Sequence, residues 1–204
     1  MPTTDLGPAA ATLAVVLHGI SDAQLGDPTP CPKYTVGDLV DHVGGLTTAF
    51  TEAATKAASA GGSANPPPGD ATRLAPDWRS DIPAALDGLA AAWRDDEAWE
   101  GMTAAGGIEM PGAVAGLVAL NELVVHGWDL ARATDQPFDA SDATLAVLRD
   151  LVAGFAPADD DPDHPIVNDG TLAFGPAVAV SDASPLLDQV VALTGRDPAW
   201  SPPR

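Results

Sequence analysis

The spacing of apolar residues is the feature that most constrains this chain of 204 residues. Proline and glycine divide the sequence into segments, and within them apolar residues recur about every 3.6 residues, as on one face of an α-helix. They do not alternate as in a half-buried strand. The sequence therefore predicts a series of helices, with expected ranges 6–25, 35–60, 82–101, 111–133, 141–155 and 185–195.

Local signals mark several ends of these helices. Thr35 is followed three positions later by an acid, Asp38, which is a variant of the capping box. Pro83 and Pro111 are expected in the first turn of a helix, where proline is tolerated. The pair at 106–107, two glycines between short mixed runs, indicates either a small hairpin or a loop.

Together these elements predict an all-α fold, an up-and-down four-helix bundle with extra C-terminal helices and a small hairpin. We expect a single domain over residues 1–204, with the bundle core at about 4–155 and a C-terminal appendage at about 156–204. Within the appendage, residues 168–174 predict a turn and a short strand. The short connection after the first helix favours antiparallel packing of the first two helices.

The chain has 29 acidic and 9 basic side chains and a formal charge of −20. Nucleic acids and anionic lipid surfaces bind clustered Lys and Arg, so we expect neither as a partner. No stretch approaches the roughly 20 uncharged apolar residues of a spanning helix. The apolar run 9–17 follows Asp5 and no basic residue, which favours a helix over a targeting signal. A single cysteine, Cys31, fits a reducing cytoplasm.

His42 is the first candidate for a chemical role. On a helical wheel its nearest neighbours are apolar and lie within about 80° of it, which predicts that His42 is on the buried face. Polar residues such as Asp41 and Thr48 fall on the other side, where solvated residues are expected. Taken alone, His42 is interpreted as a hydrogen-bonded core residue.

Glu122 and His126 change that interpretation. They are an i, i+4 pair on one face of the helix expected over 111–133, so both side chains reach the same point in space. Their helix is apolar nearly all round, and a buried carboxylate needs a compensating cation. The alternative is an ordinary acid and imidazole pair. Together with His42, however, two imidazoles and one carboxylate are typical of a catalytic divalent-metal site with one open position.

Three other residues are weaker candidates. His18 on the first helix is either a core or a surface residue. His164 follows the acidic run 159–163, which predicts a solvated loop without the spacing of a calcium site. Cys31 lies between two prolines and has no companion cysteine, which favours a structural role.

Charged residues near the three candidate ligands have alternative roles. Asp38 and Asp129 lie within one turn of His42 and His126, so either acid could hold the second ring nitrogen of its neighbour. For Asp38 we favour helix capping. Arg132 points away from His126, which favours an ion pair with Asp129 or another acid over a contact with a substrate carboxylate.

Several of these residues lie in segments that resemble a known family. The segments are TPCP at 29–32, TVGDLVDH at 35–42, NELVVHGWDLARAT at 121–134 and GRDPAW at 195–200. They resemble the short actinobacterial metal-binding proteins related to the N-terminal domain of mycothiol-dependent maleylpyruvate isomerase. Those proteins belong to the DinB-like superfamily of four-helix bundles. The resemblance spans nearly the whole chain.

The resemblance implies a metal ion bound by His42, Glu122 and His126, with Zn²⁺ expected first and Ni, Mn or Fe as alternatives. It also implies mycothiol, a low-molecular-weight thiol, as co-substrate, together with an electrophilic second substrate. Too few residues follow the helix expected over 141–155 for the separate C-terminal domain of the full isomerase. Maleylpyruvate is therefore not carried over as the substrate.

The expected function is a cytoplasmic, metal-dependent thiol S-transferase or isomerase. A metal-binding bundle without turnover, acting as a ligand sensor or an interaction protein, stays open because an open coordination site serves both. The substrate, the native metal and the formation of a homodimer are left open by the sequence.

Overall fold

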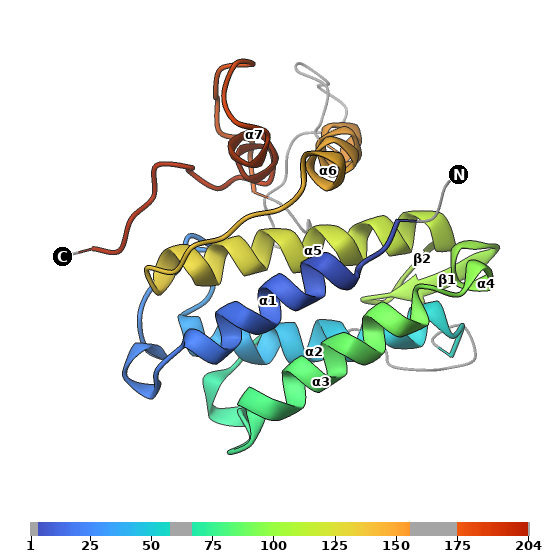
Figure 1. Cartoon of the computed structure of the whole chain (residues 1–204), viewed down its shortest axis with the longest axis horizontal. Helices are drawn as coiled ribbons and strands as arrows, with labels where there is room; N and C mark the ends of the chain where they lie inside the picture. The colour runs from blue at the N-terminus through green and yellow to red at the C-terminus, as the bar shows by residue number, and fades with distance from the viewer. Residues whose placement is uncertain (1–3, 58–66, 156–174, 204) are drawn as a thin grey trace. The chain divides into compact units, whose positions relative to one another are not determined.

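A computed structural model describes residues 4–57, 67–155 and 175–203 of the chain (Figure 1). The predicted turn and strand at 168–174, and His164, lie outside these residues. In the described ranges the regular elements are α1 (Gly7–Gly19), α2 (Val36–Ala54), α3 (Trp78–Ala92), α4 (Asp96–Trp99), β1 (Met102–Ala105), β2 (Ile108–Pro111), α5 (Gly112–Ala133), α6 (Asp142–Phe155) and α7 (Leu186–Leu193).

The first helix is shorter than predicted. α1 ends at Gly19, and Ile20 adopts an extended conformation. A separate 3₁₀ turn follows over Asp22–Gln24, because the Ser21 backbone N–H and hydroxyl both donate to the Gln24 side-chain oxygen and so cap a new turn. Local capping therefore overrides the apolar periodicity that extended the prediction to residue 25.

The third predicted helix is two helices in the structure. α3 begins at Trp78, four residues before the predicted start, so Pro83 lies inside the helix rather than in its first turn. The buried indole of Trp78 anchors this earlier start. α3 ends at Ala92, and α4 begins anew because the Asp95 carboxylate accepts a hydrogen bond from the Glu97 backbone N–H.

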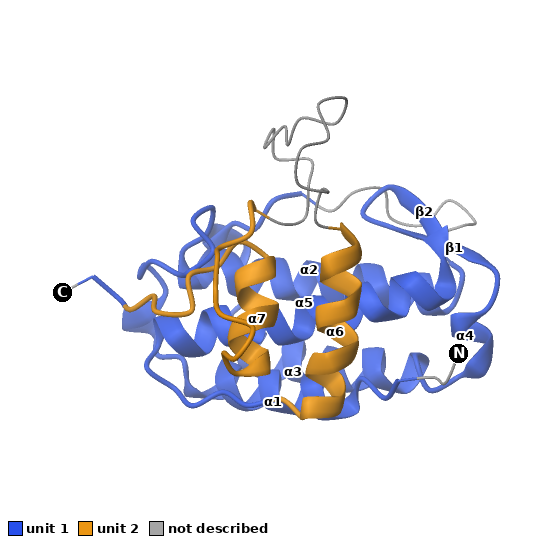
Figure 2. Cartoon of the chain, turned by 90° about the horizontal axis from the view of Figure 1, so that it is seen from above, with its two compact units in different colours: residues 1–139, 202–204 blue, residues 140–201 orange. Residues whose placement is uncertain are grey.

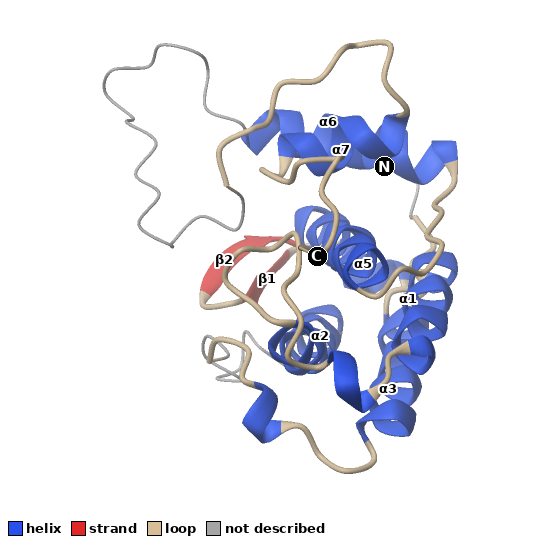
Figure 3. Ribbon diagram, turned by 90° about the vertical axis from the view of Figure 1, so that its left-hand side faces the viewer, coloured by secondary structure: helices blue, strands red, loops and turns tan. Residues whose placement is uncertain are grey.

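Four helices form the bundle. α1 packs against α3 and α5, and α2 packs against the same two helices. Viewed end-on, α1 and α2 therefore lie diagonally across the bundle (Figure 3). The expectation that these two helices pack as neighbours is wrong, although they do run in opposite directions. The connection over residues 20–35, with its 3₁₀ turn and a β-bridge between Pro28 and Thr35, is long enough to cross the end of the bundle.

Chain direction does not alternate strictly along the bundle. Trp93 at the end of α3 donates its indole N–H to the Phe50 carbonyl near the end of α2, at 3.1 Å. Lys56, just after α2, donates to the Ala98 carbonyl of α4 at 2.7 Å. α2 and α3 therefore run in the same direction, and α1 and α5 run opposite to them (Figure 1). The predicted all-α bundle with a small hairpin is confirmed, but two packed pairs, α2 with α3 and α1 with α5, share a direction, so neighbouring helices do not simply alternate.

α5 is the most buried helix of the bundle. Sixteen of its 22 residues are buried. Few of its residues are charged, because burying a charge is costly. By length and composition it is also the one described helix able to cross a membrane, which the sequence analysis did not anticipate. Its most apolar window is 72% buried within the protein, and a core helix passes the same test.

The hairpin predicted as one alternative for 102–110 is present. β1 and β2 pair antiparallel, with Ala105 opposite Ile108. Gly106 and Gly107 form the two-residue turn with φ values of 59° and 79°, which only glycine adopts readily at both positions. The Thr103 hydroxyl donates to the Ala53 carbonyl at 2.7 Å and so ties the hairpin to α2.

The chain divides into two compact units (Figure 2). The first, residues 1–139 with 202–204, contains the bundle and the hairpin. In the second, residues 140–201, α6 packs with α7. This boundary precedes α6, whereas the sequence analysis placed α6 in the bundle core. The single domain with a core to residue 155 stays a prediction.

We expect Thr35→Ala to lower the free energy of unfolding by about 1 kcal/mol, because the capping box predicted at this helix start is present. The Thr35 hydroxyl accepts from the Asp38 backbone N–H, and the Asp38 carboxylate accepts from the Thr35 backbone N–H at 3.0 Å. Urea denaturation measures the change. Thr48→Ala, at an exposed position of the same helix, is the control and should stay within about 0.5 kcal/mol. Equal midpoints for both variants would contradict the role of the cap.

Candidate metal centre

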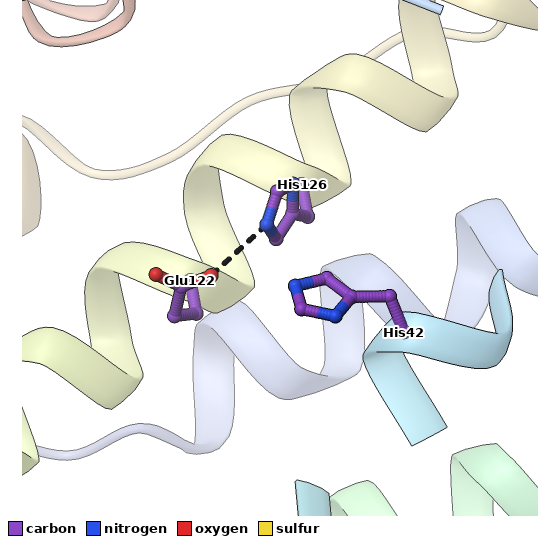
Figure 4. Close-up of side chains that lie close together, drawn as sticks. All are labelled: His42, Glu122 and His126. Atoms are coloured by element: carbon purple, nitrogen blue, oxygen red, sulfur yellow. Dashed lines mark ion pairs between the residues drawn. The ribbon is translucent and has the colours of Figure 1, made fainter. Parts of the chain in front are cut away.

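α2 and α5 bring His42, Glu122 and His126 together (Figure 4). One ligand atom from each side chain lies within 4.8 Å of the others. Glu122 and His126 are one turn apart on α5, and His42 faces them from the early part of α2. This is the trio that the helical wheels placed on inward faces.

The three side chains differ in burial. Only 8% of the His126 side chain and 13% of the Glu122 side chain is exposed, while His42 is half-buried. The helical wheel predicts His42 on the buried face, and in the structure it is only half-buried. His126 is the more deeply buried of the two imidazoles.

His126 lies between two carboxylates. Its Nε2 is 2.9 Å from Glu122 Oε2, and its Nδ1 is 3.0 Å from Asp129 Oδ2. Asp129 is completely buried. Nδ1–H donates to Asp129, which fixes the orientation of the ring and directs Nε2 towards Glu122. The contact between Asp129 and His126, considered from the sequence as one option, is present.

The two acids also set the charge of His126 in the metal-free protein. Burial lowers the pKa of His126, but the hydrogen bonds and negative charges of Asp129 and Glu122 outweigh burial and raise the pKa to about 9. In the metal-free protein the His126 ring is therefore protonated at neutral pH, and this positive charge lies between the Glu122 and Asp129 carboxylates.

A divalent ion fits this set of donors. A tetrahedral Zn²⁺ with bonds of about 2.0–2.1 Å places its ligand atoms roughly 3.4 Å apart. The Glu122 and His126 atoms, now 2.9 Å apart, would have to separate slightly, and His42 would have to approach within the present 4.8 Å spread. The ion would replace the proton that Glu122 and His126 share. Two imidazoles and a carboxylate suit Zn²⁺ and related divalent metals.

Tyr34 is a neighbour of the site that the sequence analysis missed. Its ring centroid lies 5.0 Å from that of His42, which in turn makes an edge contact with His126 at 5.2 Å. Burial raises the pKa of Tyr34, and the charges of Cys31 and Glu122 add to this effect. Tyr34 lies in a loop, where apolar periodicity gives no signal, so only the folded chain reveals its position.

The acids that flank His42 hold a neighbouring loop. Asp38 completes the capping box and also accepts from the Ala71 backbone N–H at 2.9 Å. Burial raises the pKa of Asp38, but its hydrogen bonds outweigh this and lower it. Asp41 accepts from the Asp70 backbone N–H at 3.0 Å and pairs with Arg73 at 2.6 Å. The prediction that Asp41 is solvated is wrong, because this loop covers it and leaves only 16% of its side chain exposed.

The remaining candidates are not members of the His42, Glu122 and His126 trio. His18 is exposed, and its ring bonds to the Ala14 carbonyl at 2.7 Å. Cys31 is buried in its proline-flanked turn. The Arg132 guanidinium lies over the Trp128 ring, 5.8 Å from its centroid, and the predicted ion pair of Arg132 with an acid stays a prediction.

Comparison with known proteins identifies the family. The sequence-family model named mycothiol maleylpyruvate isomerase N-terminal domain matches residues 6–131. This range includes all three candidate ligands. This chain belongs to that family. The resemblance found in the sequence is thereby confirmed, and the match ends before α6.

Two further comparisons found proteins that are similar in sequence or in fold. Uncharacterised proteins from two strains of Mycobacterium tuberculosis are each 32% identical over 152 residues, covering 69% of this chain and 71% of their own length. The crystal structure of the mycothiol-dependent maleylpyruvate isomerase is similar in fold, with a TM-score of 0.52 and 18% identity, over 74% of this chain and 70% of that chain.

The raised pKa of His126 predicts how the stability of the metal-free protein depends on pH. A raised pKa stabilises the folded state fully below the ordinary histidine value of about 6.5, and this contribution disappears as the pH rises through about 9. We therefore expect the free energy of unfolding of chelator-treated protein to fall between these two pH values. Nuclear magnetic resonance titration of the His126 ring should give the raised pKa directly. Asp129→Asn should lower that pKa, and a titration near 6.5 in the unmutated protein would contradict the arrangement.

Proposed function

We propose that this chain is a divalent-metal-dependent thiol S-transferase or isomerase that uses mycothiol as co-substrate. The observation that carries the proposal is the convergence of His42, Glu122 and His126 within 4.8 Å at a half-buried position of the bundle. Zn²⁺ is the expected ion. The family match and the thiol dependence stated in the name of the similar isomerase support mycothiol as the thiol.

A bound divalent ion would supply a Lewis acid that favours thiolate over thiol at neutral pH. The protein itself contributes orientation. Asp129 holds His126, and the packing of α2 against α5 sets the separation of His42 from the other two ligands. Three protein donors leave one coordination position for a small molecule, and the half-buried side of His42 gives it access.

The two reaction classes differ in the fate of the thiol. In a transfer, the thiolate sulfur would form a bond to an electrophilic carbon and stay on the product. Either that carbon's bond to a leaving group breaks, and the group departs with the electron pair, or a C=C π bond breaks and its electrons take up a proton. In an isomerisation, the same bond forms and later breaks, so the thiol is regenerated.

The interior next to Glu122 contains a small cavity whose lining is apolar apart from Thr47 and Glu122 itself. We place the reaction in the cytoplasm, where a thiol co-substrate stays reduced.

We expect the purified protein to bind about one divalent ion per chain, as open three-ligand sites do. Because ligation stabilises only the folded state, added Zn²⁺ should raise the melting temperature of the wild-type protein. His42→Ala, Glu122→Ala and His126→Ala should each gain little. His18→Ala, which removes an exposed histidine, is the matched control and should respond as wild type does. Calorimetry with and without chelator tests this, and a wild-type response in His42→Ala would place the site elsewhere.

Turnover is tested by incubating the Zn²⁺-loaded protein with mycothiol and a panel of electrophiles. We expect adduct or isomerised product to form faster than with chelator-treated protein or with His42→Ala. Metal binding without any rate increase across the panel would contradict the enzyme proposal and favour a metal-binding bundle without turnover.

A further inference from the structure

The aromatic ring beside His42 is held at both ends. On the backbone side, the Tyr34 N–H donates to the Cys31 carbonyl at 3.1 Å, and the Tyr34 carbonyl accepts from the Thr29 hydroxyl at 2.9 Å. At the far end of the side chain, the Tyr34 hydroxyl accepts from the Gly69 backbone N–H at 3.4 Å. Tyr34 is thus held by a turn at its backbone and by a separate segment of chain at its hydroxyl.

That separate segment, residues 68–73, is here called the strap. It is fixed to the first turns of α2 by the acids on either side of His42. Asp38 accepts from the Ala71 N–H, and Asp41 accepts from the Asp70 N–H and pairs with Arg73. The strap is therefore positioned by the same helix turn that carries the candidate ligand His42.

Gly69 is the point where the strap touches this helix turn. A Cβ at Gly69 would collide with the Asp38 carbonyl oxygen and lie 3.0 Å from the His42 Cβ. Only glycine allows so close an approach without moving the backbone. The Gly69 N–H therefore reaches the Tyr34 hydroxyl from a position that is set by contact with α2.

Tyr34 in turn restricts the His42 ring. The two rings are 5.0 Å apart and tilted by 32°, so the Tyr34 ring covers one face of the imidazole. His126 contacts the imidazole at an interplanar angle of 81°. A ring enclosed in this way has fewer rotamers to lose when its nitrogen binds a ligand.

We propose that Tyr34 is a positioning residue for His42, and that the strap holds Tyr34 in place through Gly69. This inference rests on the proposed function, because it concerns how the metal ligands are oriented. His126 is oriented by a carboxylate, Asp129, whereas the orientation of His42 is set by an aromatic ring that is clamped at its hydroxyl. Residues that orient a ligand in this way commonly contribute about 10- to 100-fold to metal affinity.

The first test compares Zn²⁺ affinities, measured by competition with a chromophoric chelator. Tyr34→Leu removes the ring and should weaken Zn²⁺ binding by about 10- to 100-fold. Tyr34→Phe keeps the ring and loses only the hydroxyl, so it should recover most of the affinity, to within about two- to fivefold of wild type. Circular dichroism of the metal-free variants verifies that the bundle is folded.

The second test acts on the strap and leaves Tyr34 unchanged. Gly69→Ala should displace the strap and weaken Zn²⁺ binding, whereas Gly88→Ala should bind as wild type does, because a Cβ at Gly88 meets nothing within 4 Å. Combining Gly69→Ala with Tyr34→Phe should weaken binding by less than the product of the two single effects, since both remove the same hydrogen bond. If Tyr34→Leu fails to fold, the proposal is tested by Gly69→Ala alone and in combination with Tyr34→Phe.

A spectroscopic measurement separates positioning from general stability. With Co²⁺ in place of Zn²⁺, the visible absorption bands report ligand geometry, and Tyr34→Leu should change them while Gly88→Ala should not. Wild-type affinity and an unchanged Co²⁺ spectrum in both Tyr34→Leu and Gly69→Ala would overturn this inference alone. Wild-type protein that binds neither ion would instead overturn the proposed function, and this inference with it.

Discussion

The interaction on which the site depends is the contact between buried Asp129 and His126. A carboxylate with no exposure to solvent is very costly unless a hydrogen-bonded cation or donor compensates it, and His126 is that donor, one turn earlier on α5. The same ring approaches Glu122 with its other nitrogen. Two acids around one imidazole create a local demand for positive charge, which either a proton or a metal ion can satisfy. α5 can carry this cluster only because the bundle surrounds it.

The surroundings of His42 follow a different principle. α2 begins at a capped threonine, and its first acids are used to hold the strap, so polar residues near the site serve the backbone of another segment. Close contact at Gly69 and the ring of Tyr34 then restrict the imidazole by packing. The cluster thus combines His126, which is oriented by carboxylates deep in the bundle, with half-buried His42, which packs against an aromatic ring.

Much of this arrangement is predictable from the sequence, and the failures have common causes. The Glu122 and His126 pair follows from helical spacing, and the Thr35 cap and the glycine turn of the hairpin follow from local chemistry. α1 was predicted too long because a capped turn at Ser21 competes with its apolar pattern. Asp41 was predicted to be solvated because a wheel shows one helix at a time and cannot include a strap that arrives from residues 68–73.

The sequence by itself determined roughly where the main helices lie and that His42, Glu122 and His126 share inward faces of α2 and α5, because these features depend on spacing along one chain segment. Only the tertiary structure decided that α1 and α2 lie diagonally, that α2 and α3 run in the same direction, and that Tyr34 lies against His42. These features depend on the paths of connecting loops. Loop paths are set by contacts between residues far apart in sequence, such as Gly69 with Tyr34, which carry no periodic signal.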